Sequence, residues 1–119
     1  MKKNFFNALV VFSLVLVFGC SKDNQNDPTK KTVVTNVSLP SMVCSKCANT
    51  IQKAVYHVDG VKDVEVDVDK KTAEITYVPY QTNVETIERA INEAGYDANN
   101  TKRDSSAYEG LEKCCKING

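Results

Sequence analysis

Two cysteines, Cys44 and Cys47, stand three positions apart in the segment Ser-Met-Val-Cys-Ser-Lys-Cys at residues 41–47. A spacing of three lets both sulfur atoms converge on one point when the second cysteine lies in the first turn of a helix. Two thiolates are soft ligands, which select Cu(I), Hg(II), Cd(II) or Zn(II) over Mg(II) or Ca(II). The pair could also be a redox couple, because Cys-x-x-Cys occurs in thiol–disulfide oxidoreductases as well.

A helix is expected to begin at this pair. Apolar residues recur at steps of three and four, which marks one helix face: Cys47, Ile51, Ala54, Val55 and Val58. Asp59-Gly60 ends the pattern, and glycine readily takes the left-handed conformation found after helices. The start of a helix offers free N–H groups and a positive dipole end, which lower a thiol pKa and favour the metal-binding thiolate.

Three further segments have the pattern of β-strands. Residues 33–39 are rich in β-branched side chains and stop at Pro40. The next two alternate apolar and polar residues, with the apolar positions at Val64, Val66 and Val68 and at Ala73, Ile75 and Tyr77. A fourth strand is expected to begin at residues 96–98.

A second helix is expected before that fourth strand. Thr82 and Glu85 have the spacing of a capping box, and Gly95 closes the helix. The resulting order, βαββαβ, predicts an α+β domain at residues 33–99 with the ferredoxin-like fold. In this fold an antiparallel sheet carries both helices on one face.

The amino-terminal residues have the features of a bacterial lipoprotein signal. Lys2 and Lys3 precede a run at residues 8–18 that is apolar except for Ser13. The run is shorter than the about 20 residues that a membrane-spanning helix needs and suits a signal peptide. Val-Phe-Gly-Cys at residues 17–20 resembles a lipobox, which implies removal of residues 1–19 and acylation of Cys20. The alternative is an ordinary signal peptide whose last residue is a cysteine.

Residues 21–32 contain no apolar side chain and cannot build a core. We expect residues 20–32 to be a flexible tether. It would hold the domain outside the cytoplasm, at the periplasmic side of a bacterial membrane or at the cell surface.

Residues 100–119 form a carboxy-terminal extension. Ser106 and Glu109 could cap a short helix at about residues 107–115. The chain length between the fourth strand and the end of this helix is sufficient for a return to the first cysteine pair.

Adjacent cysteines at Cys114 and Cys115 are the second feature of chemical interest. They could join Cys44 and Cys47 in one metal site, form a separate thiol pair that passes metal on, or make a structural disulfide. Four cysteines allow three pairings, and the sequence does not choose among them.

The remaining ionisable residues carry no other chemical signal. His57, the only histidine, falls near the end of the first helix, far from its cysteine end, and is expected to be a solvated helix-end residue. Residues 34–99 hold six basic and ten acidic side chains, a net charge of −4, which excludes a basic nucleic-acid binder. We expect no enzymatic activity.

The segment at residues 33–99 resembles the heavy-metal-associated domain of copper chaperones, metal-ATPase amino-terminal domains and periplasmic mercury-binding proteins. The matching positions are Met42-Val43-Cys44-Ser45-Lys46-Cys47, Gly60-Val61 with Val64, then Thr82, Ile87, Ile91 and Gly95-Tyr96. Ser41 and Val43 stand where the family usually has glycine and threonine. The resemblance implies that Cys44 and Cys47 are the ligands.

The same resemblance suggests supporting roles for two further residues. Met42 is a soft side chain, but the matching methionine of the family packs under the metal loop, so we expect core support. Tyr96 is expected in the loop that approaches the cysteines, where it could shield the ion, place a hydroxyl near it, or simply pack.

These patterns together predict a membrane-tethered, extracytoplasmic protein that sequesters or relays a soft metal by thiolate exchange. Cu(I) is the first candidate because of the Met-x-Cys-x-x-Cys pattern, followed by Hg(II) and Zn(II), with Cd(II) also compatible. The expected partners are a metal-transporting ATPase or another metal-binding protein, and the membrane through the lipid anchor.

Two other functions are compatible with the cysteines. The first is a thiol–disulfide oxidoreductase using Cys44 and Cys47, although the element order and the residues around the pair differ from the thioredoxin pattern. The second is a structural lipoprotein stapled by a disulfide.

Overall fold

Three antiparallel strands form the sheet in the described part of the chain. They are β1 (Val33–Ser38), β2 (Val61–Asp67) and β3 (Thr72–Tyr77), in the spatial order β1-β3-β2. Thr35 and Val64 both pair with Ile75, so β3 lies at the centre. The computed structural model describes residues 29–117. The expected signal peptide at 1–19, the Cys20 lipidation site and the tether up to residue 28 lie outside the described residues.

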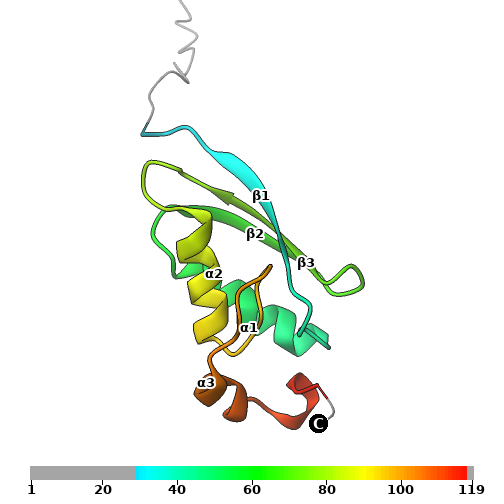
Figure 1. Cartoon of the computed structure of the whole chain (residues 1–119). Coiled ribbons are helices and arrows are strands. Elements are labelled where there is room, and N and C mark those ends of the chain that lie inside the picture. Colours follow the sequence, from blue (N-terminus) through cyan, green and yellow to red (C-terminus); the bar gives the residue numbers. More distant parts are fainter. Residues whose placement is uncertain (1–28, 118–119) are drawn as a thin grey trace, which may run out of the picture.

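Two helices pack on one face of this sheet, as Figure 1 shows. They are α1 (Ser45–Tyr56) and α2 (Val84–Glu93). The core between the layers is formed by buried side chains from all of these elements: Val37, Ile51, Val55, Val64, Ile75, Ile87 and Ile91. The predicted ferredoxin-like arrangement is therefore confirmed. Within residues 29–117, no helix is both long and apolar enough to cross a membrane.

The predicted fourth strand is wrong in detail. Instead of pairing as a strand, this segment binds the end of β1 through Asn99 alone. The Asn99 backbone N–H donates to the Ser38 carbonyl, and the Asn99 Oδ1 accepts the Ser38 N–H, both at 2.8 Å. Asn99 has φ +51°, a left-handed conformation that asparagine tolerates. The chain then turns back, with only an isolated bridge between Ala98 and Thr101.

The start of α2 also differs from the prediction by one residue. Asn83 is the N-cap, and its Oδ1 accepts the Thr86 N–H at 2.8 Å. The capping box assigned to Thr82 and Glu85 is therefore wrong, because the better-placed amide of Asn83 takes this role. The Thr82 side chain is buried instead, and its hydroxyl has no hydrogen-bond partner among the described residues.

The extension contains two short helices where one was predicted at residues 107–115. The first, α3 (Ser105–Glu109), has Asp104 as its N-cap, with Oδ1 accepting the Ala107 N–H at 2.8 Å. It ends at Gly110, and the second, the 3₁₀ helix η1 (Lys113–Cys115), follows after a break. Asp104 rather than Ser106 begins the helix, because its carboxylate can accept the free N–H of the first turn.

Gly95 is the point at which the extension docks on the domain. It has φ +100°, and a Cβ there would lie 3.1 Å from both the Leu111 Cδ1 and the Tyr108 backbone nitrogen. The Arg103 guanidinium lies 3.7 Å from the Tyr108 ring centroid and 3.5 Å from the Asp97 carboxylate. These contacts hold α3 at the carboxy-terminal end of α2, and η1 then lies near the first turn of α1 (Figure 1).

Gly95→Ala should reveal the importance of this docking. Both the positive φ and the crowding oppose a side chain, so we expect the free energy of unfolding to fall by about 1–3 kcal/mol in urea denaturation. Gly110→Ala is the matched control, because Gly110 has φ −75° and no atom within 3.4 Å of a built Cβ. It should be neutral or stabilise by up to about 1 kcal/mol. Equal effects of the two substitutions would contradict this account.

Candidate metal site

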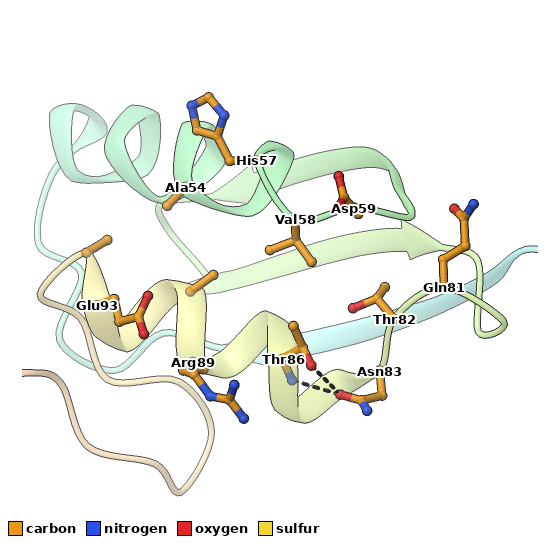
Figure 2. Close-up of a pocket in the computed structure, with 12 residues that line it drawn as sticks. Ala54, His57, Val58, Asp59, Gln81, Thr82, Asn83, Thr86, Arg89 and Glu93 are labelled. Carbon is orange, nitrogen blue, oxygen red and sulfur yellow. Dashed lines mark hydrogen bonds between the residues drawn. The ribbon is translucent and has the colours of Figure 1, made fainter.

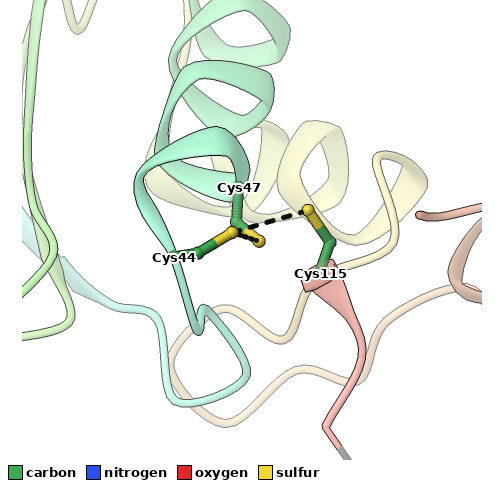
Figure 3. Close-up of side chains that lie close together, drawn as sticks. All are labelled: Cys44, Cys47 and Cys115. Carbon is green, nitrogen blue, oxygen red and sulfur yellow. Dashed lines mark hydrogen bonds between the residues drawn. The ribbon is translucent and has the colours of Figure 1, made fainter. Parts of the chain in front are cut away.

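Cys44 and Cys47 lie together at the amino-terminal end of α1. Cys44 is the N-cap, with an extended backbone at φ −154°, and its carbonyl accepts the Ala48 N–H at 3.2 Å. Cys47 lies in the first helical turn and is fully buried. The two sulfur atoms are 3.0 Å apart, so the i, i+3 spacing brings them to one point, as Figure 3 shows.

A third sulfur approaches from the extension. The Cys115 Sγ lies 3.8 Å from the Cys44 Sγ, and the three sulfur atoms of Cys44, Cys47 and Cys115 all lie within 4.8 Å of one another. Cys115 is only 3% exposed. Figure 3 shows it reaching the α1 pair from a separate segment of the chain.

Cys114 lies outside this three-sulfur cluster. Its side chain is exposed, and its Sγ lies 4.0 Å from both the Cys115 Sγ and the Glu112 carboxylate. The structure therefore brings one of the two tail cysteines to the first pair and leaves the other facing solvent. All four cysteines among residues 29–117 are free thiols.

Two buried residues support the loop that carries the pair. Met42 is completely buried in the core cluster. Ser41, which is 1% exposed, accepts the Asp97 N–H on its Oγ at 2.8 Å. This hydrogen bond joins the Cys44 loop to the segment after α2, and the sequence reasoning missed it. The signal that could have found it was the serine in the place of the usual family glycine.

Tyr96 is fully buried beside the cluster. Burial, together with the nearby sulfur atoms of Cys47 and Cys115, raises the pKa of its phenol well above the usual range. The hydroxyl therefore stays protonated, and it has no hydrogen-bond partner among the described residues. It is a neutral donor near the sulfur atoms of Cys47 and Cys115.

The thiols of Cys44 and Cys115 are perturbed in opposite directions. Hydrogen bonds from the Cys47 thiol and the Cys47 backbone lower the pKa of Cys44 to about 7. Burial, reinforced by the neighbouring Cys47, raises the pKa of Cys115 to about 12. In the metal-free protein Cys44 is therefore partly ionised at neutral pH, whereas Cys115 is a thiol.

An ion pair between Lys46 and Glu112 spans the rim of the cluster. It joins the first turn of α1 to the residue that precedes η1. Both side chains are more than half exposed, at 59% and 62%, so the pair contributes little stability by itself. It brings Glu112 beside the first turn of α1, a contact between distant segments that the sequence did not reveal.

A groove of about 730 Å³ lies elsewhere, between α1 and α2. Residues that line it include His57, Asp59, Thr86 and Arg89, several of which are labelled in Figure 2. His57 is the exposed C-cap of α1, at the opposite end of the helix from Cys44. No cysteine lines this groove, so it is separate from the sulfur cluster.

The fold and the thiol pair at a helix start define a class of small ferredoxin-like metal-binding domains. Residues 36–97 match the heavy-metal-associated domain family over more than half of the chain, and the chain belongs to this family. The match ends at residue 97, so the extension with Cys114 and Cys115 lies beyond it.

Curated relatives include both mercury and copper proteins. The chain is 37% identical over 65 residues to the mercuric transport protein periplasmic component of Pseudomonas fluorescens, which covers 55% of this chain and 71% of the relative. It is 30% identical over 92 residues to the probable copper-transporting ATPase HMA5 of Arabidopsis thaliana, covering 77% of this chain. The matched region is only 9% of that ATPase.

The similar solved structures also include both a mercury protein and a copper-binding domain. The chain is similar to oxidized MerP from Ralstonia metallidurans CH34, with a TM-score of 0.56, 34% identity and coverage of 57% of this chain and 94% of that one. It is also similar to a copper-binding domain of the P-type ATPase HMA7, with a TM-score of 0.54, 28% identity and coverage of 55% and 88%.

The opposite pKa shifts predict selective alkylation of the metal-free, reduced chain. Because its pKa is lowered from 9.0 to about 7, Cys44 should react with iodoacetamide with a midpoint near pH 7. Cys115 should stay slow through pH 9, because a raised pKa keeps it protonated. Peptide mapping by mass spectrometry measures both rates. Cys47→Ala should move the Cys44 midpoint upward, and an unchanged midpoint would contradict the assigned cause.

Proposed function

We propose that this chain binds a soft metal ion between the thiolates of Cys44 and Cys47 and sequesters or relays it. The observation that carries the proposal is the convergence of the two sulfur atoms, 3.0 Å apart, at the amino-terminal end of α1. Family membership supports it, because the pair lies within residues 36–97, which match the heavy-metal-associated domain family. No catalytic step is required.

Cu(I) is the first candidate cargo, followed by Hg(II), Zn(II) and Cd(II). Thiolate sulfur favours these ions over hard cations. The named relatives divide between mercuric transport and copper transport, which supports a soft ion without choosing one. The Met-x-Cys-x-x-Cys pattern favours Cu(I). A two-thiolate site suits both Cu(I) and Hg(II), which accept low coordination numbers, better than Zn(II), which prefers four ligands.

Ligand exchange supplies the mechanism of transfer. A thiolate of the partner adds to the metal held by Cys44 and Cys47, giving a three-coordinate intermediate. One cysteine of this chain then leaves, and the second follows after another partner ligand has added. Cys44 is half-buried and Cys47 is fully buried, so Cys44 is the first to be displaced. No electron is transferred in any step.

The place of action in this proposal is outside the cytoplasm, on a lipid anchor at Cys20. The support is the lysine-led apolar segment and the lipobox-like residues 17–20. Membrane tethering would keep the site near a metal-transporting ATPase or another membrane-bound metal carrier, which are the proposed partners.

The metal proposal is tested by titrating the purified, reduced chain with Cu(I), Hg(II) and Zn(II) in competition with chromophoric chelators. Cys44→Ser combined with Cys47→Ser should weaken Cu(I) affinity by more than ~100-fold, since changes outside the ligand set already cost 10–100-fold. Cys114→Ser is the matched control and should bind as the unaltered chain does. Weak binding by the unaltered chain, together with cysteine-dependent insulin reduction, would favour the oxidoreductase instead.

The anchor is tested separately in bacterial cells by incorporation of radiolabelled palmitate. The unaltered chain should be labelled and should fractionate with membranes, because acylation at Cys20 adds several buried hydrocarbon chains. Cys20→Ser should lose the label and leave the membrane fraction. Equal labelling of both proteins would contradict the assignment of Cys20.

A further inference from the structure

The three-sulfur cluster is closer to a trigonal metal site than to a two-ligand site. Three sulfur atoms bound to one ion at about 2.3 Å stand about 4.0 Å apart in a trigonal plane. In the structure the sulfur atoms are 3.0 Å apart between Cys44 and Cys47 and 3.8 Å apart between Cys44 and Cys115, with all three within 4.8 Å of one another. Side-chain movements of about 1 Å would therefore accommodate an ion.

Cys115 is directed inward by contacts that do not involve sulfur. Leu111 packs against Gly95, and Glu112 pairs with Lys46 in the first turn of α1. The Cys115 N–H donates to the Glu112 carbonyl at 2.9 Å, which forms the turn of η1. The η1 turn gives the two adjacent cysteines opposite environments. The Cys115 side chain is 3% exposed, whereas the Cys114 side chain faces solvent.

We propose that the extension is a ligand-bearing cover, in which Cys115 supplies a third thiolate to the metal held by Cys44 and Cys47. This inference rests on the proposed function and specifies its coordination. The family match ends at residue 97, so the third ligand is supplied by a segment outside the matched domain. Binding forms three metal–sulfur bonds, and each cysteine that was a thiol releases its proton to solvent.

A third ligand changes what the site does with its cargo. A two-coordinate ion is open to an incoming thiolate, whereas the covered ion already has three ligands and lies beneath η1. The Cys115 bond must break, or the extension must lift, before a partner can complete an exchange. The covered state is therefore a holding state, and the lifted state is the one that transfers metal.

Copper K-edge X-ray absorption tests the coordination directly. The purified full-length chain carrying one equivalent of Cu(I) should show three sulfur ligands. Cys115→Ser and Cys115→Ala should each show two, and circular dichroism checks that both are folded. Cys114→Ser is the matched control, since it alters the adjacent but exposed thiol, and it should retain three.

Transfer kinetics give a second readout. Cu(I) should pass to a chromophoric chelator at least ~10-fold faster from Cys115→Ser than from the unaltered chain, while Cys114→Ser should leave the rate unchanged. Gly95→Ala, which keeps every thiol but disturbs the docking, should also accelerate transfer. Unchanged transfer rates in both Cys115→Ser and Gly95→Ala would contradict the proposal that the extension covers the metal.

The outcomes separate this inference from the proposed function. If the unaltered chain binds Cu(I) tightly but with two sulfur ligands, the proposed third ligand is contradicted, whereas the proposed site at Cys44 and Cys47 is not. Three sulfur ligands in Cys115→Ser would overturn the assignment to Cys115. Failure of the unaltered chain to bind Cu(I), Hg(II) or Zn(II) tightly would instead overturn the proposed function itself.

Discussion

The close approach of the extension to Gly95 is the contact on which the three-sulfur cluster depends. Gly95 has no side chain, and its positive φ lets the chain leave α2 at an angle that accepts Leu111 and the backbone of α3. Any Cβ at this position would push against backbone atoms, which cannot move aside as a flexible side chain can. The position of Cys115 is thus set by a backbone feature some twenty residues earlier in the chain.

The docking is local and modest in size. Leu111 is only partly buried, and the Lys46–Glu112 ion pair is largely solvent-exposed. The Glu109 side of the Lys116–Glu109 pair is also exposed, whereas the Arg103–Asp97 pair is mostly buried on both sides. Segments with few buried apolar contacts open at a lower free energy than the core does. The extension can therefore lift while the sheet and the two main helices stay folded, a property that a cover over an exchange site requires.

Electrostatics at the sulfur cluster favour an anionic metal complex. Three thiolates around Cu(I) or Hg(II) carry a net negative charge, and the cluster lies at the amino-terminal end of a 12-residue helix, where free N–H groups and the helix dipole stabilise negative charge. The protonated phenol of Tyr96 adds a donor on the buried side. Ionisation of the Cys115 thiol, which burial opposes, then becomes favourable when the metal supplies its positive charge.

The sequence was sufficient to predict the fold of the domain but not the structure of its extension. Strong periodicity placed α1, α2 and the three strands, and the i, i+3 cysteines at a helix start are a local feature that sequence can predict. The prediction of a fourth strand was wrong because the Asn99 side chain accepts the Ser38 backbone N–H, and the chain then turns back. The inward turn of Cys115 could not be predicted, because it follows from tertiary contacts with Gly95 and Lys46 rather than from any local pattern.

Closure of the extension and metal affinity are thermodynamically linked if Cys115 is a ligand. An ion that binds the closed form more tightly must stabilise closure by the same factor. A partner that binds the lifted extension must, by the same reciprocity, weaken the hold on the ion. Release is then coupled to recognition: the ion stays covered in solution and becomes available where a partner competes for the extension. The exposed contacts at Lys46 and Glu112 are the part of the cover that such a partner could reach first.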